Sequence, residues 1–418
     1  MPDFLTPLLV GFSILALLGV VFEEQTKVSK AEVTLFFGTL SWVLLFVFTE
    51  RGDPRAAINA ELAENIGEIA GLWLYLLATM TFVAYLNHKG MIEKLLYLLL
   101  PVRIGERALL FATGVFCFVL SSLVDNITAT LVSMALVLSL KMDQRKTLRF
   151  ATLVVFSINS GGAALITGDV TTLMIFLAGK LEITEFLLLA GPALGAVLLL
   201  SAFLSIGMDG VLNVERRVMP VRGIDVGIGL IFLLTIGATL AGNILFQIPP
   251  VLSFLTGLSI MFLVSRFVDP EATNDPVLEY IRRIEFETLL FFLGILLIVG
   301  VLKELRVLDA VSGVYAVMPG WVANYLVGLA SAVVDNVPLT AAVLKSDIAL
   351  TRADWMGLTY TVGVGGSLLI IGSAAGIVAM SRVPGLTFVS YLRYAWLSWL
   401  AFTAGYAAVV ALGRGLLA

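Results

Sequence analysis

Two stretches of the chain carry the same polar pattern: Ser121-Ser-Leu-Val-Asp125-Asn126-Ile-Thr-Ala-Thr130 and Ser331-Ala-Val-Val-Asp335-Asn336-Val-Pro-Leu-Thr340. Ser, Asp, Asn and Thr recur at identical spacing, and each stretch lies inside a long apolar region. Of the 418 residues, 59% are hydrophobic and 13% are charged, whereas a soluble domain carries about 25% charged residues. The composition therefore excludes ordinary soluble, disordered and nucleic-acid-binding proteins, and it predicts a polytopic protein of membrane helices.

Apolar runs long enough to cross a bilayer surround these two stretches. We expect plain membrane-spanning helices at Phe4–Phe22, Val33–Thr49, Ile69–Leu86, Phe186–Met208, Val226–Phe246, Val251–Val268, Phe286–Leu302 and Tyr391–Leu412. A shorter run, Met91–Leu100, has the pattern of an amphipathic helix at the membrane surface. The first run lacks the basic start and small-residue cleavage site of a signal peptide, so we expect it to remain as a span.

Two further segments contain glycine clusters at mid-membrane depth. The first reads Asn159-Ser-Gly-Gly-Ala-Ala-Leu-Ile-Thr-Gly168-Asp169-Val-Thr171-Thr172, and the second reads Gly365-Gly-Ser367-Leu-Leu-Ile-Ile-Gly372-Ser373. Both contain a glycine pair followed by another glycine at the same interval, which predicts broken helices that line a polar cavity. The alternative is close helix packing by isolated glycines, and the repeated spacing makes that explanation less adequate.

The order of plain spans, Asp-Asn stretch and glycine segment recurs in both halves. We therefore expect two copies of one unit, residues 1–208 and 225–418, joined by a cytoplasmic linker at 209–224 that includes Glu215-Arg216-Arg217. Within these copies we expect hairpins at 107–140 and 320–346, and glycine-broken helices at 147–180 and 355–381. The predicted fold class is an all-α polytopic membrane protein.

Basic residues decide the predicted topology. They flank the first Asp-Asn stretch on both sides: Lys89, Lys94, Arg103 and Arg107 precede it, and Lys141, Arg145, Lys146 and Arg149 follow it. Since basic flanks favour the cytoplasm, the stretch is expected to enter and leave on that side, as a re-entrant hairpin with Asp125-Asn126 near its tip. Each unit then makes five membrane crossings, which makes the units inverted repeats and places both termini outside.

Asp125, Asp169 and Asp335 are the carboxylates that lie well inside apolar regions. A membrane-buried carboxylate is costly, and it normally marks an ion or proton pathway. The alternative is N-capping of a half-helix, which Asp and Asn do well, and Pro338 fits a first helical turn. The two interpretations are compatible. Because a cap needs no charge, we expect these acids to bind a cation and protons.

Neutral oxygen donors accompany the acids, as a dehydrated hard cation requires. We expect Asn126 and Asn336 to complete a Na⁺ site with Asp125 and Asp335, and Asp169 to share the cation and the protons. Supporting polar residues are Ser121, Asn159, Thr171, Thr172, Ser331, Ser367 and Ser373. For Thr130 and Thr340, interhelical hydrogen bonding is an equally good explanation. Glu68, Glu285 and Glu287 are expected to be solvated residues at the starts of spans.

Other chemistries lack their sequence signatures. The sequence contains no Walker A motif, no nucleophile elbow and no metal-type Cys/His cluster, and its one cysteine and one histidine are Cys117 and His88. We therefore expect a transporter rather than an enzyme, with no catalytic residues and no cofactor. An ion gradient, rather than ATP, is the expected energy source. The lipid bilayer and small cations are the expected partners, without nucleic acid.

At the Asp-Asn stretches and the glycine segments the sequence resembles the NhaD-type sodium/proton antiporters of the ion transporter superfamily. The resemblance covers nearly the whole chain, and the polar residues on which that family relies match the site residues named above. It implies exchange of Na⁺ or Li⁺ for H⁺, an inner-membrane location, and a homodimer with a scaffold and a moving transport domain. The alternatives are a sodium-coupled carboxylate symporter of the same superfamily, an arsenite exporter, a membrane-embedded enzyme and a channel.

Overall fold

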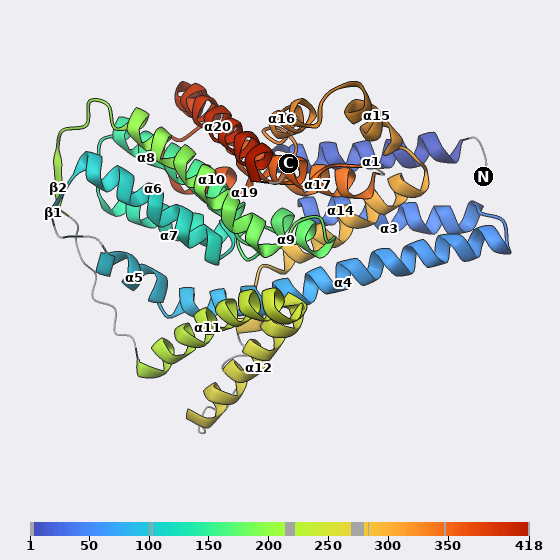
Figure 1. Cartoon of the computed structure of the whole chain (residues 1–418), viewed down its shortest axis with the longest axis horizontal. Helices are drawn as coiled ribbons and strands as arrows, with labels where there is room; N and C mark the ends of the chain where they lie inside the picture. Colours follow the sequence, from blue (N-terminus) through green and yellow to red (C-terminus); the bar gives the residue numbers. More distant parts are fainter. Residues whose placement is uncertain are drawn as a thin grey trace.

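The computed structural model describes residues 4–99, 101, 103–213, 222–268, 280–282, 284–346 and 348–416. Nearly all of this part of the chain is helical (Figure 1), so the expectation of an all-α protein is confirmed. The linker residues Glu215-Arg216-Arg217 lie outside the described residues, as does Leu100 at the end of the predicted surface helix.

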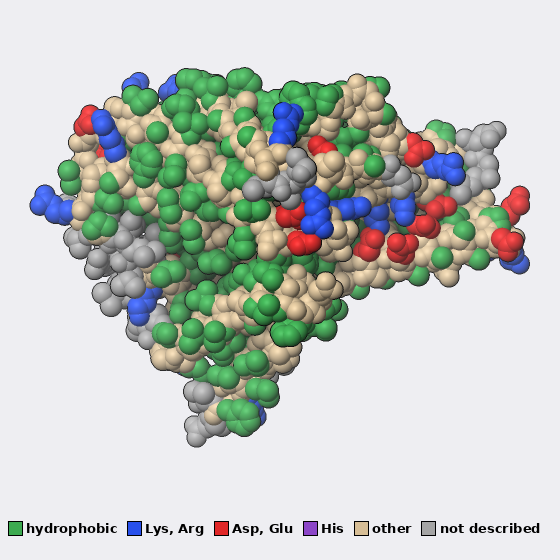
Figure 2. Space-filling view, in the orientation of Figure 1, with side chains coloured by type: hydrophobic (Ala, Val, Ile, Leu, Met, Phe, Trp, Pro, Cys, Tyr) green, Lys and Arg blue, Asp and Glu red, His purple; other side chains and the backbone are tan. Residues whose placement is uncertain are grey.

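Within the described ranges, eight helices are long and apolar enough to cross a membrane, which confirms the polytopic class. They are α3 (Lys30–Phe48), α4 (Asp53–His88), α6 (Glu106–Leu123), α10 (Ile183–Leu204), α11 (Gly223–Phe246), α12 (Pro250–Val268), α14 (Phe286–Glu304) and α20 (Phe388–Leu416). The first predicted span forms α1 (Leu5–Val21), which is shorter but apolar. Hydrophobic side chains accordingly cover much of the visible surface (Figure 2).

Helix α4 differs from its prediction in length. It has 36 residues, which extend about 54 Å at 1.5 Å per residue, well beyond the roughly 30 Å of a hydrocarbon core. The predicted span Ile69–Leu86 is its C-terminal half, so Glu68 lies in the middle of the helix and the expectation that it is a residue at a helix start is wrong. The helix begins at Asp53, after Gly52 with φ +108°, and its acidic first half projects at the right of Figure 2.

Each Asp-Asn stretch separates two helices. The first lies between α6 and α7 (Asn126–Ser139), and the second lies between α16 (Gly320–Ala330) and α17 (Asn336–Lys345). Asp125 Oδ1 accepts a hydrogen bond from the Thr128 N–H at 2.9 Å, and Asp335 Oδ1 accepts one from the Val337 N–H at 3.2 Å. Both acids are therefore N-caps, as the capping interpretation predicted.

Each glycine segment interrupts a helix. The first break separates α8 (Gln144–Gly162) from α9 (Val170–Leu177), and the second separates α18 (Arg352–Gly365) from α19 (Ala374–Arg382). A Cβ at Gly168 would lie 2.5 Å from the Ser121 carbonyl oxygen, and one at Gly372 would lie 2.5 Å from that of Ala332. Glycine is thus required because each break packs against backbone beside an Asp-Asn stretch.

The remaining elements lie outside the long helices. They are α2 (Glu23–Thr26), α5 (Met91–Leu99), α15 (Asp309–Val317) and an antiparallel pair of strands, β1 (Arg103–Gly105) and β2 (Val211–Asn213). The strand pair was not expected from the sequence. It joins the chain before α6 to the chain after α10, so the first residues of the predicted linker are part of the folded structure.

Contacts between the halves bring the Asp-Asn stretches and the breaks together. Helix α7 packs on α19, and α17 packs on α9, so the helix after each Asp-Asn stretch contacts the second part of the broken helix of the other half. Helices α3 and α14 pack closely beside this group. The Trp42 indole donates to the Leu297 carbonyl oxygen at 3.0 Å across that contact.

Candidate cation site

A cavity of about 100 Å³ lies between the Asp-Asn stretches and the helix breaks. Helices α4 and α14 contribute Tyr75 and Phe291 to its wall. Seven of the residues predicted for the site line it: Asp125, Asn126, Asn159, Asp169, Asp335, Asn336 and Ser373. The fold thus brings residues from four separate stretches of sequence into one enclosure.

Asp169 is the centre of the polar contacts. Asn126 Nδ2 and Asn336 Nδ2 both donate to its Oδ2 at 3.0 Å. The N–H of Thr171 donates to its Oδ1 at 3.0 Å, and the Thr171 hydroxyl donates at 3.1 Å. Asp169 is 8% exposed, and all four donors are neutral. No basic side chain in the described part of the chain lies within 4.0 Å of its carboxylate.

Ser373 occupies the position in the second glycine segment that Asp169 occupies in the first. Comparing the two residues distinguishes the need for a helix cap from the need for a charge. Asp169 caps α9, and Ser373 caps α19 by accepting a hydrogen bond from the Gly376 N–H at 3.3 Å. A neutral hydroxyl therefore does the capping at one break. The charge of Asp169 exceeds what a cap requires, which favours a role in binding a cation or proton.

Asn159 presents an amide oxygen without a partner. Its Nδ2 donates to the Val155 carbonyl oxygen at 2.9 Å and to Ser373 Oγ at 3.0 Å, which settles the orientation of the amide. Its Oδ1 is buried and accepts no hydrogen bond from the described residues. Because an unsatisfied buried oxygen is costly, this atom is suited to ligate a cation entering the cavity that Asn159 lines.

Five predicted residues lie behind the cavity instead of in its described lining: Ser121, Thr171, Thr172, Ser331 and Ser367. Ser121 Oγ lies 2.8 Å from the Ile158 carbonyl oxygen, and Ser331 Oγ lies 2.8 Å from that of Val362. These two bonds join α6 to α8 and α16 to α18. Ser121 and Ser331 thus hold the helices that carry the ligands, so they are positioning residues.

Thr130 and Thr340 follow the packing explanation. Their hydroxyls donate to the carbonyl oxygens of Asn126 and Asn336, at 2.7 and 2.9 Å, within their own helices. A hydroxyl used in this way needs no cation. Their repeated spacing reflects helix structure and not direct ligation.

Two charged residues in the cavity wall were missed or given secondary weight from the sequence. Glu285 is exposed, as expected for a residue preceding a span, but it also lines the cavity. Lys30, the first residue of α3, lines the same cavity. Neither residue sits inside an apolar run or a repeated motif, so local sequence carried no signal for either.

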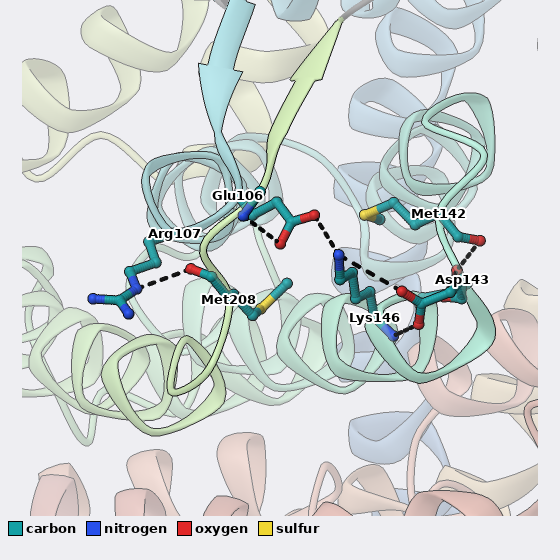
Figure 3. A network of polar contacts seen from close by, with 8 residues as sticks. Glu106, Arg107, Met142, Asp143, Lys146 and Met208 are labelled. Carbon is teal, nitrogen blue, oxygen red and sulfur yellow. Dashed lines mark hydrogen bonds and ion pairs between the residues drawn. The ribbon is translucent and has the colours of Figure 1, made fainter.

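A second buried carboxylate, Glu106, lies outside the cavity in a network of ion pairs (Figure 3). Lys146 Nζ lies 2.5 Å from Glu106 Oε1 and 3.6 Å from Asp143 Oδ2. The N–H of Gly210 donates to Glu106 Oε2 at 3.2 Å. Asp143 caps α8, and the N–H of Lys146 lowers the pKa of its carboxyl. This network joins the starts of α6 and α8 to the chain after α10.

Known proteins match this chain over most of its length. A family model described as citrate transporter matches residues 5–365. The Na⁺/H⁺ antiporter NhaD of Alkalimonas amylolytica is 31% identical over 94% of this chain and 88% of its own. NhaD of Vibrio parahaemolyticus is 31% identical over 87% of this chain and 95% of its own. Sodium/proton antiporter 1 of Arabidopsis thaliana is 31% identical over 94% of this chain and 69% of its own.

These similarities confirm the resemblance read from the sequence. The relatives are named as antiporters, so the expectation of a transporter rather than an enzyme is confirmed. Together with the eight span-length helices, the bacterial relatives identify a multi-pass protein of the inner membrane. The chain therefore belongs to the NhaD-type sodium/proton antiporters and matches the wider citrate transporter family.

Proposed function

We propose that the protein exchanges Na⁺ or Li⁺ for H⁺ across the cytoplasmic membrane, with cation and protons competing for the carboxylates of the cavity. The observation that carries this proposal is the meeting of Asn126 and Asn336 on one oxygen of Asp169. Asp125 and Asp335 line the same cavity. The relatives named Na⁺/H⁺ antiporter support the same exchange.

Charge balance provides the coupling. A cation that sheds its water needs several oxygen ligands and a compensating negative charge. Asp125, Asp169 and Asp335 supply the charge, while Asn126, Asn336 and Asn159 supply neutral amide oxygens. When protons occupy the carboxylates, the compensating charge is lost and the cation leaves. When a cation binds, it displaces the protons, so the two fluxes are coupled by mutually exclusive occupation.

The proposed architecture consists of two inverted repeats, residues 1–208 and 225–418, joined by the linker at 209–224. Each repeat makes five crossings and carries one re-entrant hairpin. Matching contacts support this arrangement: Ser121 bonds the Ile158 carbonyl as Ser331 bonds that of Val362. Asp125 and Asp335 also cap equivalent helices.

The proposed motion moves the hairpins and broken helices together as a transport domain. Helices α3, α4 and α14 form part of a scaffold, and two chains assemble as a homodimer. The Trp42 bond to α14 supports a rigid scaffold, as does Asn65 Nδ2 of α4, which lies 3.3 Å from the Leu296 carbonyl oxygen. The cavity between the two groups would open alternately to each side.

The second candidate is sodium-coupled carboxylate uptake, which the description of the wider family suggests. Asp125, Asp169 and Asp335 around one cavity of about 100 Å³ argue against it. An anionic substrate placed among these carboxylates would be repelled by like charge at short range.

The test uses everted membrane vesicles in which respiration establishes a pH gradient. Addition of Na⁺ or Li⁺ is expected to collapse the gradient in vesicles with the wild-type protein. Asp125→Asn and Asp335→Asn are expected to abolish the response at equal protein levels. Absence of Na⁺-dependent proton movement, together with Na⁺-dependent uptake of succinate, would establish the symporter instead.

A further inference from the structure

Lys30 lies at the junction of two cavities that both reach Asp335. The first is the central cavity described above. The second, of about 150 Å³, extends past Glu23 of α2 and Val333. Lys30, Asp335, Ser373 and Ala374 line both cavities. Among the described lining residues, Lys30 is the one basic side chain in either cavity.

The ammonium group of Lys30 is not held by an ion pair in the described structure. No described carboxylate lies within 4.0 Å of its Nζ. Instead Nζ lies 4.7 Å from the ring centre of Phe291, which lines the central cavity. A cation over an aromatic face is weakly stabilised. This contact places the ammonium at the wall of the central cavity, which Asp335 and Glu285 also line.

The backbone at Lys30 is held by contacts at the start of α3. Its N–H donates to Glu23 Oε1 at 3.0 Å, and Ser29 and Glu32 form a capping box at the start of α3. The long lysine side chain thus extends from a fixed backbone position into the wall of two cavities that Asp335 also lines.

We propose that the ammonium of Lys30 competes with Na⁺ for the carboxylates around Asp335 and so promotes cation release. The inference rests on the proposed function, since it assigns a role within the same site. A tethered positive charge in a poorly solvated cavity repels an incoming cation and stabilises the empty anionic site. Its effect depends on charge, so arginine should preserve it and methionine should remove it.

The experiment measures equilibrium binding of ²²Na⁺ to the purified full chain at one alkaline pH, and Na⁺-driven proton movement in vesicles. The variants are Lys30→Met, Lys30→Arg and Lys27→Met. Lys27 is exposed, precedes α3 and lines neither cavity, so its variant is the matched control. Thermal melting of each purified variant reports whether the protein is folded.

Lys30→Met is expected to bind Na⁺ about threefold or more tightly, as removal of a nearby like charge requires. Its KM for Na⁺ should fall with its maximal rate, because release is slower. Lys30→Arg and Lys27→Met should remain close to wild type. Unchanged or weaker Na⁺ binding in folded Lys30→Met overturns the inference. Wild-type protein that binds Na⁺ without exchanging protons overturns the proposed function, while the binding comparison still tests Lys30.

Discussion

Two buried carboxylates in this molecule have opposite surroundings. Glu106 is 3% exposed and Asp169 is 8% exposed. Glu106 faces the ammonium of Lys146 at 2.5 Å, with further support from the Gly210 N–H. Asp169 receives only neutral donors, from Asn126, Asn336 and Thr171. The Glu106 network is complete, whereas the charge of Asp169 has no counter-charge within ion-pair distance among the described residues.

This difference distinguishes a carboxylate that stabilises the fold from a carboxylate suited to bind a transported ion. Burying an ion is tolerated when a partner of opposite sign accompanies it. Around Glu106 that partner is part of the protein, so the pair stabilises the contact of α6 with α8. Around Asp169 neutral amides orient the carboxylate but leave the neutralising charge to a mobile ion. A proton and a metal cation are the two candidates, and competition between them is antiport.

The largest expected effect on cation handling is that of Asp169→Asn. An asparagine keeps the shape of the side chain, but its single amide oxygen can accept either from Asn126 and Asn336 or from Thr171, so thermal melting must show that the variant is folded. We expect Na⁺/H⁺ exchange in vesicles to fall by about 100-fold or more, because the central charge is gone. Asp209→Asn, an exposed acid beside the Glu106 network, serves as control. Substantial exchange by Asp169→Asn would remove Asp169 from the mechanism.

The next effect concerns the unpartnered amide oxygen. Asn159→Ala removes the ligand candidate, and we expect the KM for Na⁺ to rise about tenfold, as loss of roughly one ligand contact implies. Ser373→Ala removes the hydrogen-bond partner of Asn159 Nδ2 but leaves Oδ1 in place, so its KM should rise less. Initial rates at several Na⁺ concentrations distinguish the two. Because Ser373 also lines the cavity and caps α19, equal KM values would mean that Asn159 Oδ1 contributes no more to Na⁺ binding than the Ser373 hydroxyl does.

A smaller effect is expected at the repeated threonines. Thr130→Val and Thr340→Val remove hydroxyls that bond only to their own helices. The KM for Na⁺ should stay within about twofold of wild type, since neither side chain lines the cavity. A loss comparable to that of Asn159→Ala would place these hydroxyls among the ligands.

The smallest effect on the cation site is expected from the ion-pair network. Lys146→Met leaves Glu106 buried without its counter-charge, so folded yield and melting temperature should drop. In the protein that does fold, the KM for Na⁺ should remain within about twofold of wild type, because the network lies outside the cavity. Glu106→Gln combined with Lys146→Met should recover part of the yield. A change in the KM for Na⁺ without loss of stability would contradict the distinction between the Glu106 network and the cation site.

The sequence predicted much of the site because membrane burial makes polar residues conspicuous. Asp125, Asp169 and Asp335 stand out against the apolar background, and repeated spacing pairs the two Asp-Asn stretches. The same reasoning could not separate Asn159, which lines the cavity, from Ser121 and Thr172, which do not. All three are polar residues in apolar runs, and only helix rotation and packing decide which faces the cavity.

Residues at the starts of helices were harder to interpret. Glu285 precedes α14 and Lys30 begins α3, so each resembles an ordinary solvated residue at a helix start. Their place in the cavity wall depends on how α3 and α14 pack beside the hairpins. The length of α4 was missed for a related reason. Its first half is polar, so hydropathy placed the start of the helix at the first apolar residue instead of at Asp53.

The sequence by itself determined the membrane class, the repeated Asp-Asn and glycine motifs, and the three acids that a bilayer makes costly. These features depend on composition and local spacing, because every backbone group in hydrocarbon must be paired within its own helix. Only the tertiary structure decided that Asn126 and Asn336 meet on Asp169, that Asn159 Oδ1 accepts no hydrogen bond from the described residues, and that Lys30 and Asp335 line the same two cavities. Those relations depend on how helices from different halves pack together. The spacing of residues along the chain does not encode that packing.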